Sequence, residues 1–280
     1  MLSRALKMAF WVCYDHLGKL MLANLVWALA LAIPGSVALA SLVSGVPGVQ
    51  LLIGLPLGIF TVGIVLPITT AGLAHMAKIL IETRDGAVRD LFTGMRLYWR
   101  RAAGLGLLGL LTAACLLTST WFYLAKLGGP IAWLGYILSA LALWVLLFVL
   151  LMGLFLLPCL VQKRAGIVET IRVTALLVLD NPLYSLGLAI QCVALTALTM
   201  VLLPLFFFFY GSAATVTVSS AYEMLSRKYA RLQYQAETGT TLSPTAHIRV
   251  VGGSGTAIVD ETQDDYLNRG FRDFLFPWKG

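Results

Sequence analysis

Histidine and acidic side chains are the first candidates for chemistry in this sequence, because they carry general acid–base catalysis. His16 directly follows Asp15, and His75 lies at the end of an apolar run, one turn before Lys78. A groove that combined Asp15, His16 and His75 would suit an enzyme with a lipid substrate. An interfacial position beside Lys78 is the simpler interpretation of His75, and no carboxylate, histidine and nucleophile share one membrane depth. The sequence therefore predicts no catalytic residue and no enzymatic activity.

The cysteine and glycine patterns give no sign of a bound metal or cofactor. The run from Gly104 to Gly109 matches GxGxxG, but it lies inside an apolar segment that no strand precedes, so it indicates close helix packing rather than a dinucleotide site. The four cysteines are scattered without a CxxC pair, as small apolar side chains would be: Cys13, Cys115, Cys159 and Cys192. We expect no metal and no cofactor.

The elements that position these residues are apolar helices. Hydrophobic residues make up 59% of the 280 residues, charged residues 12%, and the mean hydropathy is +0.87, which exceeds what a soluble core requires. A helix of about 20 apolar residues crosses a bilayer. The sequence predicts an all-α integral membrane protein with a transmembrane domain over residues 1–232. About six transmembrane helices in three hairpins are expected at 21–43, 51–75, 102–125, 131–157, 183–203 and 205–222.

Two features of these hairpins are less regular. The second predicted span, 51–75, is rich in glycine and proline, so a partly unwound or re-entrant segment is a second interpretation of it. An amphipathic segment precedes each hairpin, at residues 3–19, 85–101 and 166–180. In the segment 85–101 apolar residues recur at helical spacing, while arginines take the other face. We expect three cytoplasmic collar helices, of which 85–101 lies in the headgroup plane.

The orientation follows from the basic residues, which are retained in the cytoplasm. All of the 20 Lys and Arg residues except Lys126 fall on alternate segments that belong to one side. Both termini are therefore predicted to be cytoplasmic, in a multi-pass protein of the bacterial inner membrane. The basic rim favours anionic membrane lipid, and nothing in the sequence suggests a nucleic acid as partner.

From residue 233 the sequence becomes polar, and residues 233–280 are predicted to form a cytoplasmic tail. Residues 247–251 and 256–259 predict a β-hairpin. The segment 264–280 predicts a short helix rich in aromatic residues, which indicates docking on a surface. Three surfaces are open to it: a partner protein, the collar helices of the chain itself, or lipid. The residues predicted to dock are Tyr266, Phe271, Phe274, Phe276 and Trp278.

One stretch of sequence resembles a known family. The run from Leu66 to Ala74 reads LPITTAGLA and closes the second predicted span, and a basic amphipathic helix around Phe92 follows it. This layout, over residues 20–230, resembles the YesL-like family of uncharacterised multi-pass bacterial membrane proteins. The resemblance implies a membrane protein, in a family with some members associated with carbohydrate uptake systems. It implies no catalytic residues.

Two functions are compatible with these observations. The first is a non-enzymatic membrane scaffold or accessory subunit, which engages a protein partner or a larger membrane complex through its cytoplasmic face and tail. The alternative is a permease or channel for a small neutral or hydrophobic solute. Its path would use uncharged groups near the glycine- and proline-rich span, although such groups more often bond a backbone carbonyl. The residues predicted for this path are Pro67, Thr69, Thr70 and Gln191.

Overall fold

The structure is a computed structural model, and it describes residues 1–126, 132–164, 166–239, 246–251, 255–260 and 265–269. Helices form nearly all of it. Five helical segments of the described part are long and apolar enough to cross a membrane: Leu17–Val43, Pro47–Thr83, Val88–Lys126, Ala132–Lys163 and Pro182–Val201. They coincide with the first five predicted spans, which confirms a helical, multi-pass membrane protein.

The first hairpin pairs α2 (Leu17–Val43) with the segment Pro47–Thr83. That segment is helical throughout: α3 (Pro47–Val49), η1 (Gln50–Gly54), α4 (Leu55–Phe60), η2 (Thr61–Val65) and α5 (Leu66–Thr83). The alternative interpretation, in which its glycines and prolines partly unwind it, is therefore not supported. Two π-helical segments, η1 and η2, absorb the irregularity instead, because a wider turn accommodates a local insertion without breaking the helix.

The second hairpin consists of α6 (Val88–Lys126) and α7 (Ala132–Lys163). Helix α6 has 39 residues, which gives a length of about 58 Å. It joins the predicted collar helix 85–101 and the predicted span 102–125, so the expectation of a separate collar helix is wrong. No proline interrupts the helix around Arg101 and Ala102, where the two predicted elements meet. Helix α5 packs along α6.

Among the three predicted hairpins, the third differs most from the helices of the structure. Helices α8 (Ile167–Asp180) and α9 (Pro182–Val201) match the predicted collar helix and fifth span. The predicted sixth span, 205–222, falls on the end of α10 (Leu203–Leu205), on η4 (Phe206–Tyr210) and on the first part of α11 (Gly211–Thr238). Most of α11 up to Leu225 is buried, and the buried residues include many small and polar side chains.

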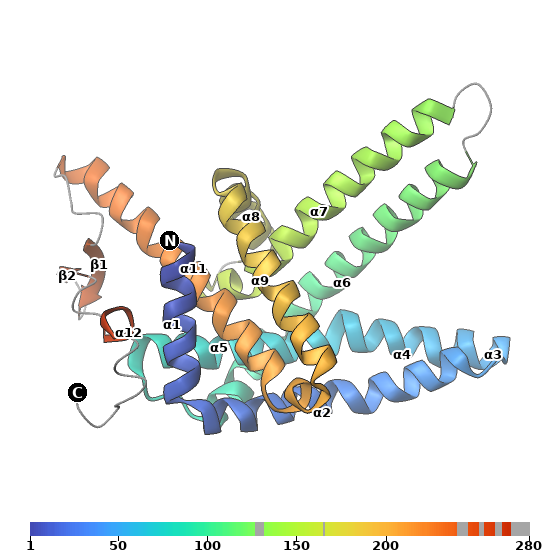
Figure 1. The fold of residues 1–280 in the computed structure, drawn as a ribbon, viewed down its shortest axis with the longest axis horizontal. Coiled ribbons are helices and arrows are strands. Elements are labelled where there is room, and N and C mark those ends of the chain that lie inside the picture. Colours follow the sequence, from blue (N-terminus) through green and yellow to red (C-terminus); the bar gives the residue numbers. More distant parts are fainter. Residues whose placement is uncertain (127–131, 165, 240–245, 252–254, 261–264, 270–280) are drawn as a thin grey trace.

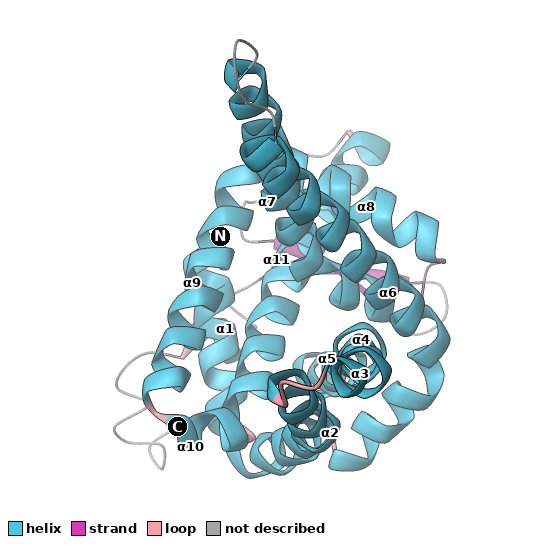
Figure 2. Cartoon of the chain, turned by 90° about the vertical axis from the view of Figure 1, so that its right-hand side faces the viewer, coloured by secondary structure: helices cyan, strands magenta, loops and turns pink. Residues whose placement is uncertain are grey.

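The core lies where α11 meets α1 (Leu2–Asp15), α2, α5 and α7. Helix α1 is amphipathic, and it buries Ala5, Met8 and Val12 completely. Figure 1 shows the hairpin of α6 and α7 and the hairpin of α2 and α4 diverging from this region. Figure 2, which views the molecule from the side of the hairpin ends, also separates the two hairpins.

The tail contains the predicted β-hairpin. Strands β1 (Ala246–Val251) and β2 (Gly255–Asp260) pair antiparallel, with Ala246 opposite Asp260 and Val251 opposite Gly255. Strand β1 lies against α11. The short helix α12 (Asp265–Asn268) follows and contacts α1.

Candidate functional site: the docking site of the tail

The tail helix α12 returns to the first helix of the chain. Tyr266 is only 2% exposed, although it belongs to a polar segment. Its hydroxyl lies 3.3 Å from Nε2 of His16, and the guanidinium of Arg84 lies 4.7 Å from the centre of its ring. Because both the hydroxyl and the ring of Tyr266 have partners, the side chain is anchored in one position.

Charged contacts continue this docking beyond the tyrosine. Arg269 Nη1 donates to both carboxylate oxygens of Asp15, at 2.7 and 2.6 Å, and the guanidinium lies 5.3 Å from the centre of the Trp11 ring. Lys7 Nζ donates to the backbone oxygen of Leu267 at 2.6 Å. Charge-assisted hydrogen bonds of this kind are stronger than neutral ones.

The sequence of α1 explains why one helix supplies these groups. Lys7, Trp11 and Asp15 are spaced four residues apart and therefore form one stripe along the helix. Arg84 is brought to the same place by the end of α5, where its φ of 62° gives the left-handed conformation that stops a helix. We call Lys7, Trp11, Asp15, His16 and Arg84 the tail docking site.

The electrostatics of the site centre on His16. Burial lowers its pKa below the ordinary value of 6.5, and the positive charges of Lys19, Arg269 and Arg84 lower it further, while Asp15 opposes them. The imidazole is therefore disfavoured in its charged form while the tail is docked. Cys13 on the same helix is inert at neutral pH, because burial raises the pKa of its thiol to about 12.

Of the five residues predicted to dock, Tyr266 is described, and it docks on a collar helix of the chain itself. Phe271, Phe274, Phe276 and Trp278 lie outside the described residues. The sequence is compatible with docking on a partner, on the chain itself or on lipid. For residues 265–269 the surface is the chain itself.

The histidines do not assemble into the catalytic groove considered above. His16 and Asp15 face the tail, whereas His75 contacts α6, where its ring centre lies 5.8 Å from that of Tyr98. Within the described residues no three His, Cys, Asp or Glu side chains form a group that could hold a metal ion.

The residues predicted for a solute path lie in different surroundings. Pro67 packs against Gly106 of α6, and Thr69 donates to the backbone oxygens of Val65 and Leu66 at 2.8 and 3.1 Å. Thr70 accepts a hydrogen bond of 3.1 Å from Trp27 Nε1. Gln191 is exposed on α9. The hydroxyls of both threonines are thus engaged within the protein.

A polar joint in the core, centred on Asn24, was not predicted from the sequence. Asn24 of α2 is fully buried. It donates to the backbone oxygens of Phe206 and Phe207 at 3.0 and 2.7 Å, and it accepts from the backbone nitrogen of Ser212 at 2.9 Å. It therefore ties α2 to η4 and to the start of α11. The signal in the sequence was a single asparagine within an apolar span. An amide inside a membrane has few hydrogen-bond partners other than neighbouring helices.

A second polar group lies between α8 and α11. Tyr229 donates to the carboxylate of Asp180, which lowers the pKa of that carboxyl, and Lys228 Nζ donates to Asn181 Oδ1 at 2.8 Å. Tyr229 and Asp180 also line a cavity of about 620 Å³, whose other walls are mostly apolar. This network fixes the end of α8 against α11.

Comparison with known proteins gives no relative. No family model, no curated protein and no solved structure matches this chain. The class of protein is therefore defined by the fold alone, as a predominantly helical, multi-pass membrane protein with a tail docked on its first helix.

Proposed function

We propose that this protein is a non-enzymatic scaffold or accessory subunit of the bacterial inner membrane, and that the docked tail controls access of a protein partner to its cytoplasmic face. The docking of Tyr266 and Arg269 on α1 carries this proposal. The buried tyrosine and the paired arginine hold the tail on one defined surface. A partner meets that surface covered when the tail is docked and exposed when it is not.

The proposal includes a topology with six crossings and both termini in the cytoplasm. Support for the sixth comes from residues 203–222, which carry no charge and end within the buried part of α11. Ser and Thr lower the hydropathy of this helix, but they are accommodated because it faces other helices rather than lipid. An even number of crossings also brings the basic segments to one side. The resemblance to the YesL-like family stays a prediction.

The test is purification of the tagged full chain from native membranes in mild detergent, followed by mass spectrometry of co-purifying proteins. We expect a stoichiometric partner whose recovery changes in Tyr266→Ala and Arg269→Gln. The matched control is Arg89→Gln, which removes the same charge from an exposed position on α6. If no partner is present in stoichiometric amount, the scaffold proposal fails. If recovery is equal in all variants, control by the tail is refuted.

The permease alternative draws less support from this arrangement. The threonine hydroxyls suggested for the path already have partners within the protein, and Gln191 is on the exposed surface of another helix. Flux of neutral solutes into vesicles that contain the purified chain would restore this alternative.

A further inference from the structure

The cavity of about 620 Å³ lies between α8 and α11, and the last turn of α7 completes its lining. None of the five residues of the tail docking site lines it. Ligand pockets of proteins measure about 300–1,000 Å³ and have mostly apolar walls with a few polar groups. The cavity agrees with this description in size and in composition.

The apolar face of α8 forms one wall. Four residues of this helix line the cavity: Val173, Leu176, Leu177 and Asp180. Their spacing of three and four positions places them on one side of the helix. Leu177 is buried in the core, whereas Leu176 is 57% exposed. One leucine therefore holds α8 against the core, while the other leaves apolar surface open to a ligand.

Helix α11 forms a second wall over three turns. Its lining residues recur at helical spacing: Tyr222, Ser226, Tyr229, Ala230 and Gln233. From the first to the last of them the helix rises by about 16 Å. Ser226 and Ala230 are small, so they leave space where larger side chains would fill the cavity. The cavity is therefore elongated along α11.

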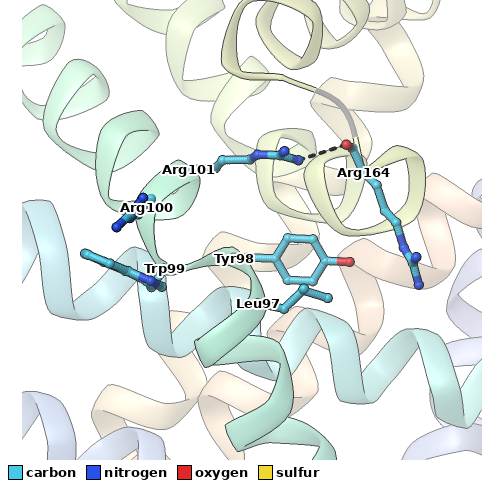
Figure 3. A pocket seen from close by; sticks show the side chains of 6 residues that line it. All are labelled: Leu97, Tyr98, Trp99, Arg100, Arg101 and Arg164. Carbon is cyan, nitrogen blue, oxygen red and sulfur yellow. Dashed lines mark hydrogen bonds between the residues drawn. The ribbon is translucent and has the colours of Figure 1, made fainter.

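Polar contacts fix the walls without any ligand. Tyr229 donates to the carboxylate of Asp180, which joins α11 to the end of α8. Lys163 lines the cavity from the last turn of α7. The next residue, Arg164, accepts a hydrogen bond of 2.9 Å at its backbone oxygen from Arg101 Nη1 (Figure 3). All three elements around the cavity are thus held in place, so the cavity is formed in advance of binding.

The lining favours an apolar ligand. Its charged residues are Lys163 and Asp180, one of each sign. The Asp180 carboxylate already accepts from Tyr229 and lies 3.7 Å from Lys228 Nζ. A ligand that bound through this carboxylate would compete with both contacts, whereas a hydrocarbon leaves them intact. The size excludes a partner helix, because a helix of the same length would occupy roughly 1,300 Å³.

We propose that the cavity between α8 and α11 binds a single fatty acyl chain. An extended chain advances about 1.2 Å per bond, so about 13 bonds match the length of the α11 wall. In the topology proposed above, these parts of α7, α8 and α11 lie on the cytoplasmic side. There a chain leaves water for the cavity, which is favourable, whereas inside the bilayer it would gain little. The inference rests on that topology and not on the scaffold function.

The experiment is competition against a photoreactive fatty acid with a terminal diazirine. The purified full chain in amphipol is labelled, and mass spectrometry identifies the labelled peptides. Saturated fatty acids of 8 to 16 carbons compete, and their free concentrations in water are measured. We expect labels on α8 and α11, with affinity rising about fourfold for each added methylene. Beyond about 14 carbons the affinity should level off, because the cavity is then full.

A matched pair of variants tests the place of binding. Ala230→Phe puts a ring into the cavity, whereas Ala236→Phe adds the same ring at an exposed position of α11 that does not line it. We expect dodecanoate to bind about tenfold more weakly to the first and unchanged to the second. Leu176→Ser, with Leu179→Ser as its control, provides an independent pair, since both leucines are exposed and only Leu176 lines the cavity. Thermal unfolding of each variant separates loss of binding from loss of fold.

Two results would overturn the proposal. One is equal loss of dodecanoate binding in Ala230→Phe and Ala236→Phe. The other is an affinity that continues to rise with the same factor up to 16 carbons, which indicates partition into an unbounded apolar phase. Competition by dodecanoyl lysophosphatidylglycerol distinguishes the sources of the chain. Stronger displacement by dodecanoate supports a free fatty acid, and stronger displacement by the lysolipid supports a membrane lipid.

Failure of this proposal and failure of the scaffold function are distinguishable. Tyr266 belongs to the tail and does not line the cavity. Tyr266→Ala is therefore expected to bind dodecanoate like the unmodified chain, whatever its effect on recovery of a protein partner.

Discussion

Helix α11 buries small polar side chains, whereas the hairpin of α6 and α7 exposes large apolar ones. In α11 the completely buried side chains include Ser212 and Ser220, whereas Leu141 and Trp144 of α7 are 59% and 70% exposed. In water the reverse is expected. Lipid is as apolar as leucine, so a large apolar side chain gains little by leaving it, and helices associate through small and polar residues instead.

This difference shows which part of the molecule is held together by its own contacts. Around α11, small residues let helices approach closely: a Cβ added to Gly211 would lie 2.7 Å from the ring of Trp27. Along the hairpin of α6 and α7, little of the surface is buried within the protein. The first region defines the fold, and the second offers its surface to lipid or to another membrane protein.

The largest expected effect comes from breaking the polar joint of the buried region. Asn24→Leu removes three hydrogen bonds, to Phe206, Phe207 and Ser212, and leaves backbone groups without partners in an apolar interior. We expect the free energy of unfolding to fall by about 2–3 kcal/mol. Unfolding in mixed micelles, followed by tryptophan fluorescence, measures it. The control Gln191→Leu makes the same kind of change on the exposed face of α9, and an equal loss there would contradict the comparison.

A smaller effect is expected where the hairpin touches the rest of the protein. A Cβ on Gly106 would lie 2.2 Å from Pro67 Cγ and 2.4 Å from the backbone oxygen of Gly63, whereas a Cβ on Gly109 meets nothing within 4 Å. Gly106→Ala should therefore separate α6 from α5 and destabilise the protein by about 1–2 kcal/mol. Gly109→Ala is the control and should leave stability unchanged or slightly raised, since alanine favours the helix. The same unfolding measurement distinguishes them.

The smallest effect concerns the tail, whose helix α12 docks on α1. Part of the lowering of the His16 pKa comes from the charge of Arg269, which belongs to the tail, so the undocked state binds more protons as the pH falls below the ordinary value of 6.5. Docking should therefore weaken on acidification and level off below the lowered pKa. Quenching by Trp11 of a bimane attached at Asn268→Cys, with the native cysteines replaced, reports it. His16→Gln removes this titration, so a pH dependence that persists in that variant would refute the assignment.

Hydropathy was sufficient to predict five of the long helices, because length and apolar composition are what a crossing requires. The hydropathy signal of the sixth predicted span, 205–222, was weaker, because the serines and threonines at the start of α11 pack against neighbouring helices. The pattern of residues 85–101 was correctly identified as helical, but pattern alone does not say where one helix ends. Because no proline lies between Val88 and Lys126, the helix continues through Arg101.

The tail docking site had the same limitation. The sequence identified a segment that docks, including Tyr266, but the acceptor could not be chosen, because the complementary stripe of Lys7, Trp11 and Asp15 resembles any amphipathic helix. Only the folded chain brings Asp15 and Arg269 within 2.6 Å. The β-hairpin was predictable because alternation and a glycine-rich turn are local signals.

The contact between Asp15 and Arg269 also has a consequence for biogenesis. The two residues are 254 positions apart, and the helices that enter the membrane lie between them. At ordinary rates of translation, roughly 10–50 s pass between the synthesis of one and the other. During that time α1 is present while its tail docking site is uncovered, so an insertion factor or chaperone has access to it. Closure of the salt bridge then marks a chain whose membrane helices have all been synthesised.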